Sequence, residues 1–154
     1  MAQEIERKYL LFALPSDLGK GVEIRQGYLT VGDPEVRVRA KGEKFFATRK
    51  GGEGFVRSEA EEEISKEVFE ILWPATASKR IEKIRYKLAG TDGLVWEIDE
   101  YFGDLSGLFS AEIELPSVDT PVLMPEAVKK VLVSDVTEDK AYKNKNLATK
   151  GLPA

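Results

Sequence analysis

Charged side chains occupy every second position in several short segments of the sequence. Arg and Lys recur in this way in some segments, and Glu and Asp recur in others. Alternate residues of an extended chain point to the same side, so each segment would carry a row of charges on one face. A row of cations can bind several phosphate oxygens at once, through planar guanidinium groups and compact ammonium groups. The rows are Glu4, Glu6 and Lys8; Arg37, Arg39 and Lys41; Thr48 and Lys50; Arg57, Glu59, Glu61 and Glu63; Lys83, Arg85 and Lys87; Glu97 and Asp99; and Glu112 and Glu114.

The acidic rows have the composition of a site for a hard metal ion. Carboxylates two residues apart in a strand can converge on Mg²⁺ or Mn²⁺, which take oxygen ligands and bridge readily to phosphates. The chain contains no His and no Cys, which excludes Ser–His and Cys–His nucleophilic sites and the usual zinc sites. Because many charges gathered in one site are tolerated only when they are paired, the two kinds of row together indicate a polyanion bound with a divalent metal.

Eight strands are expected to position these rows. Alternating polarity and the turn residues between the segments predict them. Eight mostly antiparallel strands in one small domain indicate a closed barrel, because closure removes the exposed edges that favour aggregation. The expected ranges are 4–12, 22–31, 35–41, 44–50, 55–64, 79–89, 94–102 and 109–115.

Three helices are expected beside the strands, so the fold class is mainly β with a few helices (α+β). A short helix of about two turns begins after Ser65, which is an N-cap residue, and stops at Pro74. A second helix is expected over 124–133. A final helix within 134–151 is expected to end near Gly151.

The length and composition fit one soluble domain over residues 1–154, since 42% of the residues are hydrophobic and no repeat or linker divides the chain. The apolar runs fall far short of the roughly 20 residues that span a bilayer. Met1 is followed by acidic residues, not by the basic and apolar segments of a signal peptide. We therefore expect a cytoplasmic protein that does not enter membranes, which the absence of Cys also fits. The net charge of −4 argues against nucleic-acid binding.

Two arrangements of the charged rows are compatible with the alternation. In an ordinary amphipathic sheet the charged face is solvated, and ion pairs between strands add a few tenths of a kcal/mol each. Ordinary solvated faces also contain Ser, Thr, Asn and Gln, whereas these rows are almost purely ionic. Their composition favours the inverse arrangement, in which the apolar faces pack outward against helices and the charged faces line a tunnel. An eight-stranded barrel is wide enough to hold one small ligand.

The rows also form an ordered series of motifs over nearly the whole chain. The motifs are E-I-E-R-K at 4–8, R-V-R at 37–39, T-R-K at 48–50, R-S-E-A-E at 57–61, K-I-R at 83–85, E-I-D at 97–99, E-I-E at 112–114, and D-V-T to N-L-A within 135–148. The first matches an E-x-E-x-K signature, and the series resembles the CYTH superfamily, also called triphosphate tunnel metalloenzymes. The resemblance implies an antiparallel tunnel that binds a triphosphate and a divalent metal.

The resemblance also implies roles for individual residues. By position, the metal ligands would be Glu4, Glu6, Glu112 and Glu114, and further ligands or a second metal site would come from Glu59, Glu61 and Asp99. The phosphate-binding cations would be Lys8, Arg37, Arg39, Lys50, Arg57 and Arg85.

Three residues keep two interpretations each. Lys83 is either the base that activates water or another phosphate contact; a base must lose its proton near pH 7, which requires burial or neighbouring cations. Tyr28 either lines the tunnel and orients water or is an ordinary half-buried strand residue. Lys143 either reaches the mouth of the tunnel or lies on a solvated helix face.

The resulting hypothesis is a triphosphatase that depends on Mg²⁺ or Mn²⁺ and acts on inorganic tripolyphosphate, because no pocket that would read a base is recognisable. Its nearest rival is a class IV-type adenylate cyclase, which directs the ribose 3′-hydroxyl at the α-phosphate. The pattern is also compatible with hydrolysis of thiamine triphosphate or a nucleoside triphosphate, with polyphosphate binding without turnover, and with a structural barrel that carries surface ion pairs. The expected partner is the small-molecule triphosphate alone, and the protein is expected to be a monomer or a homodimer.

Overall fold

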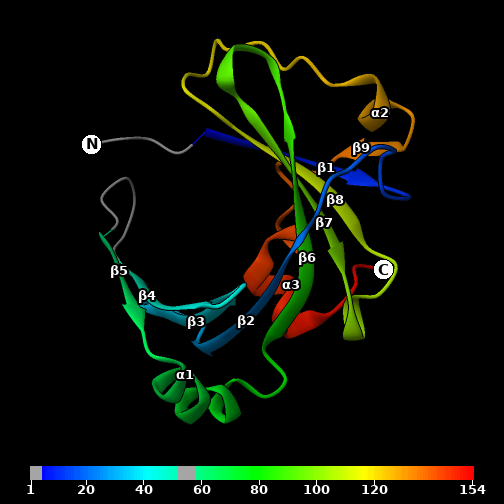
Figure 1. The fold of residues 1–154 in the computed structure, drawn as a ribbon. Coiled ribbons are helices and arrows are strands. Elements are labelled where there is room, and N and C mark those ends of the chain that lie inside the picture. The colour runs from blue at the N-terminus through cyan, green and yellow to red at the C-terminus, as the bar shows by residue number, and fades with distance from the viewer. Residues whose placement is uncertain (1–4, 52–57) are drawn as a thin grey trace.

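A computed structural model describes residues 5–51 and 58–154. All its strands belong to one antiparallel sheet in the order β5-β4-β3-β2-β6-β7-β8-β1-β9 (Figure 1). The strands are β1 (Ile5–Leu11), β2 (Val22–Thr30), β3 (Glu35–Lys41), β4 (Lys44–Gly51), β5 (Ser58–Ile64), β6 (Arg80–Ala89), β7 (Val95–Tyr101), β8 (Phe109–Leu115) and β9 (Leu132–Asp135).

The eight strands expected from alternation are confirmed. Wherever the structure describes their ends, these lie within one residue of the expected positions. The first residue of the first expected strand and residues 55–57 of the fifth lie outside the described residues. Period-two alternation was therefore sufficient to locate the strands that carry the charged rows.

The ninth strand, β9, corrects the helix expected over 124–133. Only Glu126–Lys129 is helical (α2), and the chain then extends and pairs with the free edge of β1. The backbone N–H of Phe12 donates to the carbonyl of Val131, and the N–H of Val136 donates to the carbonyl of Lys8, each at 2.9 Å. Backbone groups at the edge of β1 need partners, and this β-branched apolar segment supplies them in place of helical bonds.

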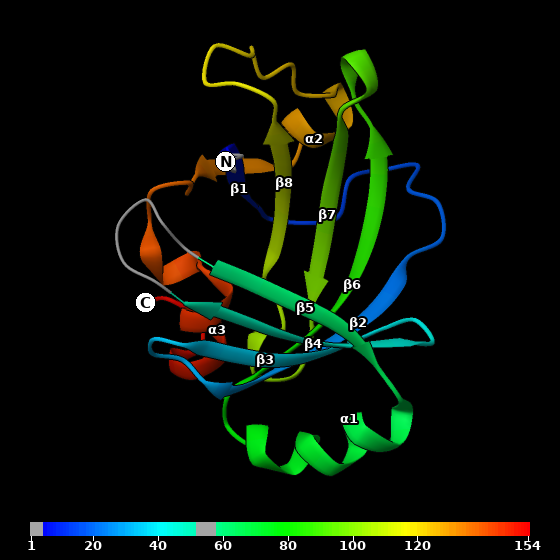
Figure 2. The same cartoon turned by 90° about the vertical axis from the view of Figure 1, so that its left-hand side faces the viewer.

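The expected closed barrel is not formed. β5 and β9 are the two edges of the sheet, and no pairing joins them among the described residues. β9 takes the edge of β1 that closure would have required. The sheet instead curves strongly into a C shape (Figure 1), and Figure 2 shows β4 and β5 running steeply across the direction of β6, β7 and β8.

One apolar core lies under α1 (Lys66–Leu72), which continues into the 3₁₀ helix η1 (Trp73–Thr76). The helix begins as expected, because the Ser65 hydroxyl accepts a hydrogen bond from the N–H of Val68 at 3.1 Å. Phe69 packs on Val38 and Ala40 from the outer face of the sheet. The α-helix ends before Pro74, but helical turns continue through it as η1. Pro74 lies in the first turn of η1, where the backbone N–H that proline lacks would have no partner within the helix.

A second apolar core lies on the outer face of β1, β7 and β8. Trp96, Ile98 and Ile113 are almost fully buried there, and Val128 of α2 packs against them. With the core under α1, this confirms that the apolar faces of the strands point outward to the helices. The charged face is the concave one.

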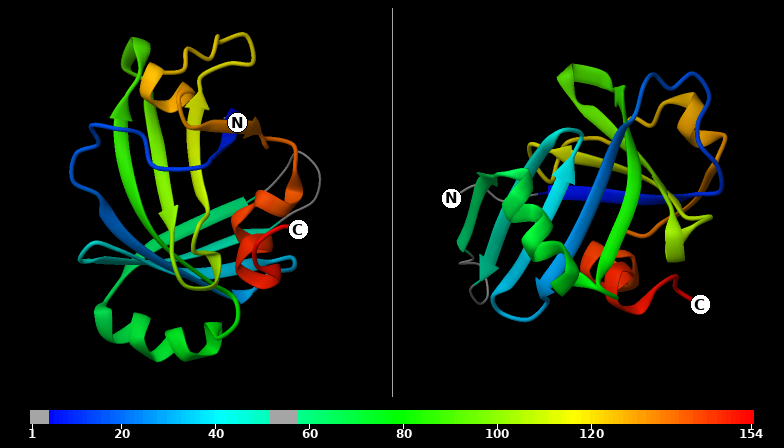
Figure 3. Two further views of the ribbon diagram at one scale, coloured as in Figure 1. Left: turned by 90° about the vertical axis from the view of Figure 1, so that its right-hand side faces the viewer. Right: turned by 60° about the horizontal axis from the view of Figure 1, so that its bottom comes forward.

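The C-terminal helix α3 (Asn144–Lys150) lies on the concave side (Figures 1 and 3). Its Leu147 packs against Tyr28 of β2 and Ile81 of β6. The helix ends at Gly151, whose φ of 78° suits a residue without a side chain. Its end was predicted correctly, but the expected range 134–151 begins with the end of β9, a loop and a short 3₁₀ helix, and only its last part is α-helical. Besides η1, the 3₁₀ helices of the described residues are η2 (Thr91–Gly93), η3 (Gly103–Leu105) and η4 (Lys140–Tyr142). Within the described ranges, no helix has the length and apolarity to cross a membrane.

Candidate active site

The register of the strands joins the charged rows into one surface on the concave face. In antiparallel pairs, directly opposite side chains are close neighbours, with Cβ atoms about 5 Å apart. The surface therefore runs from β1 through β8 and β7 to β6, and from β3 through β4 to β5. Between the two halves lies β2, whose residues on this face are the uncharged Val22, Ile24, Gln26 and Tyr28. Opposite pairs are Glu6–Glu114, Lys8–Glu112, Glu112–Glu97, Glu97–Lys87, Asp99–Arg85, Gln26–Arg39, Tyr28–Arg37, Arg37–Thr48, Thr48–Glu61 and Lys50–Glu59.

A buried ionic network lies at the centre of this surface. Lys83 Nζ donates to Asp99 Oδ2 at 2.9 Å, and the side chains of these two residues are 2% and 0% exposed. Arg85 holds both oxygens of Asp99, with Nε at 2.8 Å and Nη2 at 2.9 Å. The Nη1 of Arg85 donates to Glu97 Oε2 at 3.1 Å. Two cations thus share one carboxylate.

This sharing changes the acidity of the two buried partners. Burial lowers the pKa of Lys83, and the charge of Arg85 acts in the same direction against the attraction of Asp99. Burial alone would raise the pKa of Asp99, but the charge of Lys83 and the hydrogen bonds from Arg85 hold that pKa well below its ordinary value of 3.8. Since Arg85 already neutralises Asp99 through a bidentate contact, Lys83 is the cation of the network that loses a proton most easily.

Carboxylates gather at the β1–β8–β7 end of the surface. Glu6 faces Glu114, and Glu112 faces Glu97. Like charges directly opposite each other repel, and a divalent cation between them would relieve the repulsion. Among the described residues, no three carboxylates converge closely enough to form a finished metal site. Glu4, the other expected ligand in this region, lies outside the described residues.

The remaining expected acidic ligands lie elsewhere. Both oxygens of Asp99 are engaged by Lys83 and Arg85. Glu59 and Glu61 belong to the edge strand β5, at the other end of the sheet order from β1 and β8. Of the six expected metal ligands that the structure describes, Glu6, Glu112 and Glu114 lie on the paired strands β1 and β8, Asp99 is paired with cations, and Glu59 and Glu61 lie on β5.

The cationic wall is formed by β3, β4 and β6. Arg37 lies 3.6 Å from Glu35, and Lys50 lies 3.9 Å from Glu59. Burial lowers the pKa of Arg39, and the charges of Arg37 and Arg85 lower it further. Expected phosphate-binding cations therefore lie close enough to repel one another, which an anion among them would offset. Arg57, also expected here, lies outside the described residues.

The segment before α3 forms an additional wall. A cavity of about 360 Å³ is lined by Glu6, Lys8, Glu112 and Lys143 with other residues of this segment. The N–H of Lys8 donates to the Thr137 hydroxyl at 2.9 Å, which fixes the segment against β1. Lys143 thus lines the cavity. The interpretation that placed it on a solvated helix face would have missed this position. The motif within 135–148 was the available signal.

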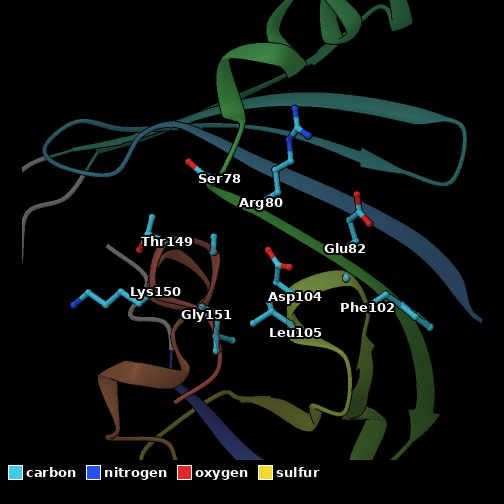
Figure 4. A pocket seen from close by; sticks show the side chains of 12 residues that line it. Ser78, Arg80, Glu82, Phe102, Asp104, Leu105, Thr149, Lys150 and Gly151 are labelled. Atoms are coloured by element: carbon cyan, nitrogen blue, oxygen red, sulfur yellow. The ribbon is translucent and has the colours of Figure 1, made fainter. Parts of the chain in front are cut away.

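Another cavity, of about 520 Å³, lies apart from the charged rows. In Figure 4, Arg80 lies on one side of it, and Asp104 of η3 and Thr149 of α3 lie on the other. The guanidinium of Arg80 already donates to the Thr76 hydroxyl and the Trp73 carbonyl, at 2.9 and 2.8 Å. The hydrogen bonds of Arg80 therefore give it a structural role. None of the expected site residues lines this cavity.

Comparison with known proteins gives a consistent group of relatives. The chain is 42% identical over 148 residues to an inorganic triphosphatase of Nitrosomonas europaea, covering 94% of this chain and 96% of that protein. It is 40% identical over 151 residues to an inorganic triphosphatase of Acetivibrio thermocellus, covering 96% and 94%. The crystal structure of the inorganic triphosphatase NE1496 matches with a TM-score of 0.78 at 39% identity, covering 100% of this chain and 99% of that one. No family model matches the sequence.

Proposed function

Because the chain belongs to the inorganic triphosphatase family, we propose that it hydrolyses inorganic tripolyphosphate on the concave face of its sheet, with the help of Mg²⁺ or Mn²⁺. One observation carries the assignment to this face. The register brings cationic rows and acidic rows together on a single surface whose opposite face is apolar and packed against helices. A linear polyanion with a divalent cation complements such a surface in charge.

The cations bind the polyphosphate chain in this proposal. Arg37, Arg39 and Lys50 hold it from the β3–β4 side, and Lys8 and Arg85 hold it from the opposite side. Guanidinium groups bind phosphate oxygens in pairs, which fixes the direction of the chain as well as its charge. Positioning and charge stabilisation are the main contributions that a protein makes to phosphoryl transfer.

The acidic end of the surface holds the metal in this proposal. Glu6, Glu112 and Glu114 are the described residues assigned to it, and the facing carboxylate pairs support their fit to a divalent cation. Mg²⁺ is commonly held by one or two carboxylates together with substrate phosphates, so a finished protein cage is not required. When bound, the metal would polarise the phosphoryl group to be transferred. Asp99 is reassigned from metal ligand to ionic partner of Lys83 and Arg85.

Lys83 acts as the base in this proposal. Its Nζ takes a proton from the water that attacks the terminal phosphorus in line with the leaving oxygen, and the bond between phosphorus and that oxygen breaks. Burial and the charge of Arg85 favour the neutral amine needed for this step. Asp99 holds the side chain of Lys83 in place.

Replacing Glu112 with glutamine is expected to weaken metal binding at least about tenfold, since even groups that only support a metal ligand contribute about 10–100-fold to affinity. The measurement is a titration of Mn²⁺ in the presence of non-hydrolysable imidotriphosphate. Glu100→Gln on the outer face of β7 is the matched control and should bind Mn²⁺ as the wild type does. Equal affinities in both variants would remove Glu112 from the metal site.

A substrate panel tests the function itself. Tripolyphosphate, ATP and thiamine triphosphate are each incubated with Mg²⁺ and with Mn²⁺, and phosphate, pyrophosphate and cyclic AMP are measured. The proposal predicts release of phosphate from tripolyphosphate at the highest kcat/KM and no cyclic AMP. Formation of cyclic AMP from ATP would identify a cyclase instead. A rise in Tm with tripolyphosphate but without turnover would identify a binding protein.

A further inference from the structure

The amide of Gln26 connects two residues of the candidate site. Gln26 lies on the concave face of β2 and is 1% exposed. Its Oε1 accepts a hydrogen bond from Arg39 Nε at 2.7 Å, and its Nε2 donates to the Tyr28 hydroxyl at 2.8 Å. Both ends of a buried amide are thereby satisfied, and each by a residue expected to contact the substrate.

The chemistry of the three groups fixes the direction of both bonds. A guanidinium can only donate, so the amide must present its oxygen to Arg39. Its nitrogen then faces Tyr28 and can only donate, so the phenolic oxygen must accept. A flipped amide of Gln26 would place two donors against each other at Arg39. The orientation therefore follows from the partners alone.

These directions determine what each neighbour can offer to a ligand. Because the oxygen of Tyr28 accepts from Gln26, its own hydrogen is directed toward another group. Burial raises the pKa of Tyr28, so the hydroxyl keeps that hydrogen at neutral pH. Because Arg39 donates its Nε to Gln26, its two terminal amino groups are the pair left for bidentate contact with phosphate oxygens.

The strand that carries Gln26 is also held from behind. A Cβ atom on Gly27 would lie 2.5 Å from Thr76 of η1, so only glycine allows this close approach. The N–H of Tyr28 donates to the carbonyl of Lys79 at 2.9 Å. The backbone that follows Gln26 is thus fixed, as the precise placement of two other side chains requires.

We propose that Gln26 is a positioning residue for the hydrolysis of tripolyphosphate. It aims the terminal amino groups of Arg39 at a phosphate and turns the O–H of Tyr28 toward the substrate or the attacking water. The proposal rests on the proposed function and adds to it a residue that neither the charged rows nor the motifs contain.

Two variants whose new side chains are similar in size to glutamine separate the positioning of Arg39 from the orientation of the Tyr28 hydroxyl. Gln26→Met removes both hydrogen bonds, and we expect KM for tripolyphosphate to rise about tenfold and kcat to fall about tenfold. Gln26→Glu still accepts from Arg39, but its second oxygen would accept from Tyr28 and turn the hydroxyl away from the substrate. We expect its kcat to fall to that of Tyr28→Phe, with no further fall when the two substitutions are combined.

A structural role alone predicts a different result. In one case, the Gln26 variants would differ from wild type in Tm but not in KM or kcat. In the other, Gln26→Glu would lower kcat independently of Tyr28, and its effect would multiply with that of Tyr28→Phe in the double variant. Either result would overturn the proposal.

Failure of the proposed function is recognised separately, as absence of turnover in the wild-type protein. In that case the rise in Tm caused by tripolyphosphate is compared between wild type and Gln26→Met. A smaller rise in the variant supports the positioning of Arg39, and an equal rise refutes it.

Discussion

Lys83→Met is expected to lower kcat for tripolyphosphate by about 10²–10⁴-fold, the usual contribution of a positioned acid or base. Methionine matches the length of the lysine stem but cannot take a proton. Asp99 keeps its bidentate contact with Arg85 in this variant, so the sheet is expected to remain folded. The measurement is steady-state hydrolysis with phosphate detection, and circular dichroism checks the fold.

Lys83→Arg decides between the two interpretations of Lys83. Arginine restores the positive charge and can bind a phosphate, but it stays protonated at any pH used for assay. If Lys83 acts as a base, Lys83→Arg should be as slow as Lys83→Met. Turnover near the wild-type rate in Lys83→Arg would show that Lys83 only binds phosphate.

Asp99→Asn is expected to lower the free energy of unfolding by about 3–5 kcal/mol, which is the usual cost of removing one partner from a buried ion pair. The variant leaves Lys83 and Arg85 in the interior without the carboxylate that both contact. Urea denaturation measures the change. Glu100→Gln, one residue further along β7 on its outer face, is the control, with an expected change within about 0.5 kcal/mol. If the free energy of unfolding changed by a similarly small amount in both variants, the network of Lys83, Arg85 and Asp99 would not stabilise the fold as expected.

The difference in free energy of unfolding between wild type and Asp99→Asn depends on pH because the pKa of Asp99 is lowered in the folded protein. The unfolded chain binds a proton at Asp99 near the ordinary pKa of 3.8, whereas the folded chain does so only at lower pH. The stability that the carboxylate contributes is therefore complete above 3.8 and is lost as the pH falls toward the folded pKa. The gap in stability between wild type and Asp99→Asn should narrow over this acidic range.

The charged surface was predictable because alternation has a period of two. Arg37 and Arg39, or Glu112 and Glu114, must share a face of any strand that contains them. Only the almost purely ionic composition of the rows favoured placing the charged face on the concave side. The structure confirms this placement, because the apolar cores around Phe69 and Trp96 lie on the outer face.

Other features depend on contacts that periodicity does not encode. The partnership of Asp99 with Arg85 requires the register between β6 and β7. Without it, the family resemblance implied that Asp99 is a metal ligand. The run from Val131 to Val133 is short and apolar, which is ambiguous between helix and strand until the edge of β1 is known. Gln26 is uncharged, so reasoning from ionic rows passed over it.

Arg39 and Arg49 provide the sharpest comparison of the two faces of the sheet. Arg39 lies on the concave face of β3, and Arg49 is exposed on the outer face of the neighbouring strand β4. The measurement is kcat/KM for tripolyphosphate in Arg39→Ala and Arg49→Ala. Because Arg39→Ala loses charge-assisted phosphate contacts, we expect its kcat/KM to fall about 10–100-fold. The kcat/KM of Arg49→Ala should stay within about twofold of wild type. Equal losses, or a larger loss in Arg49→Ala, would contradict binding of the triphosphate on the concave face.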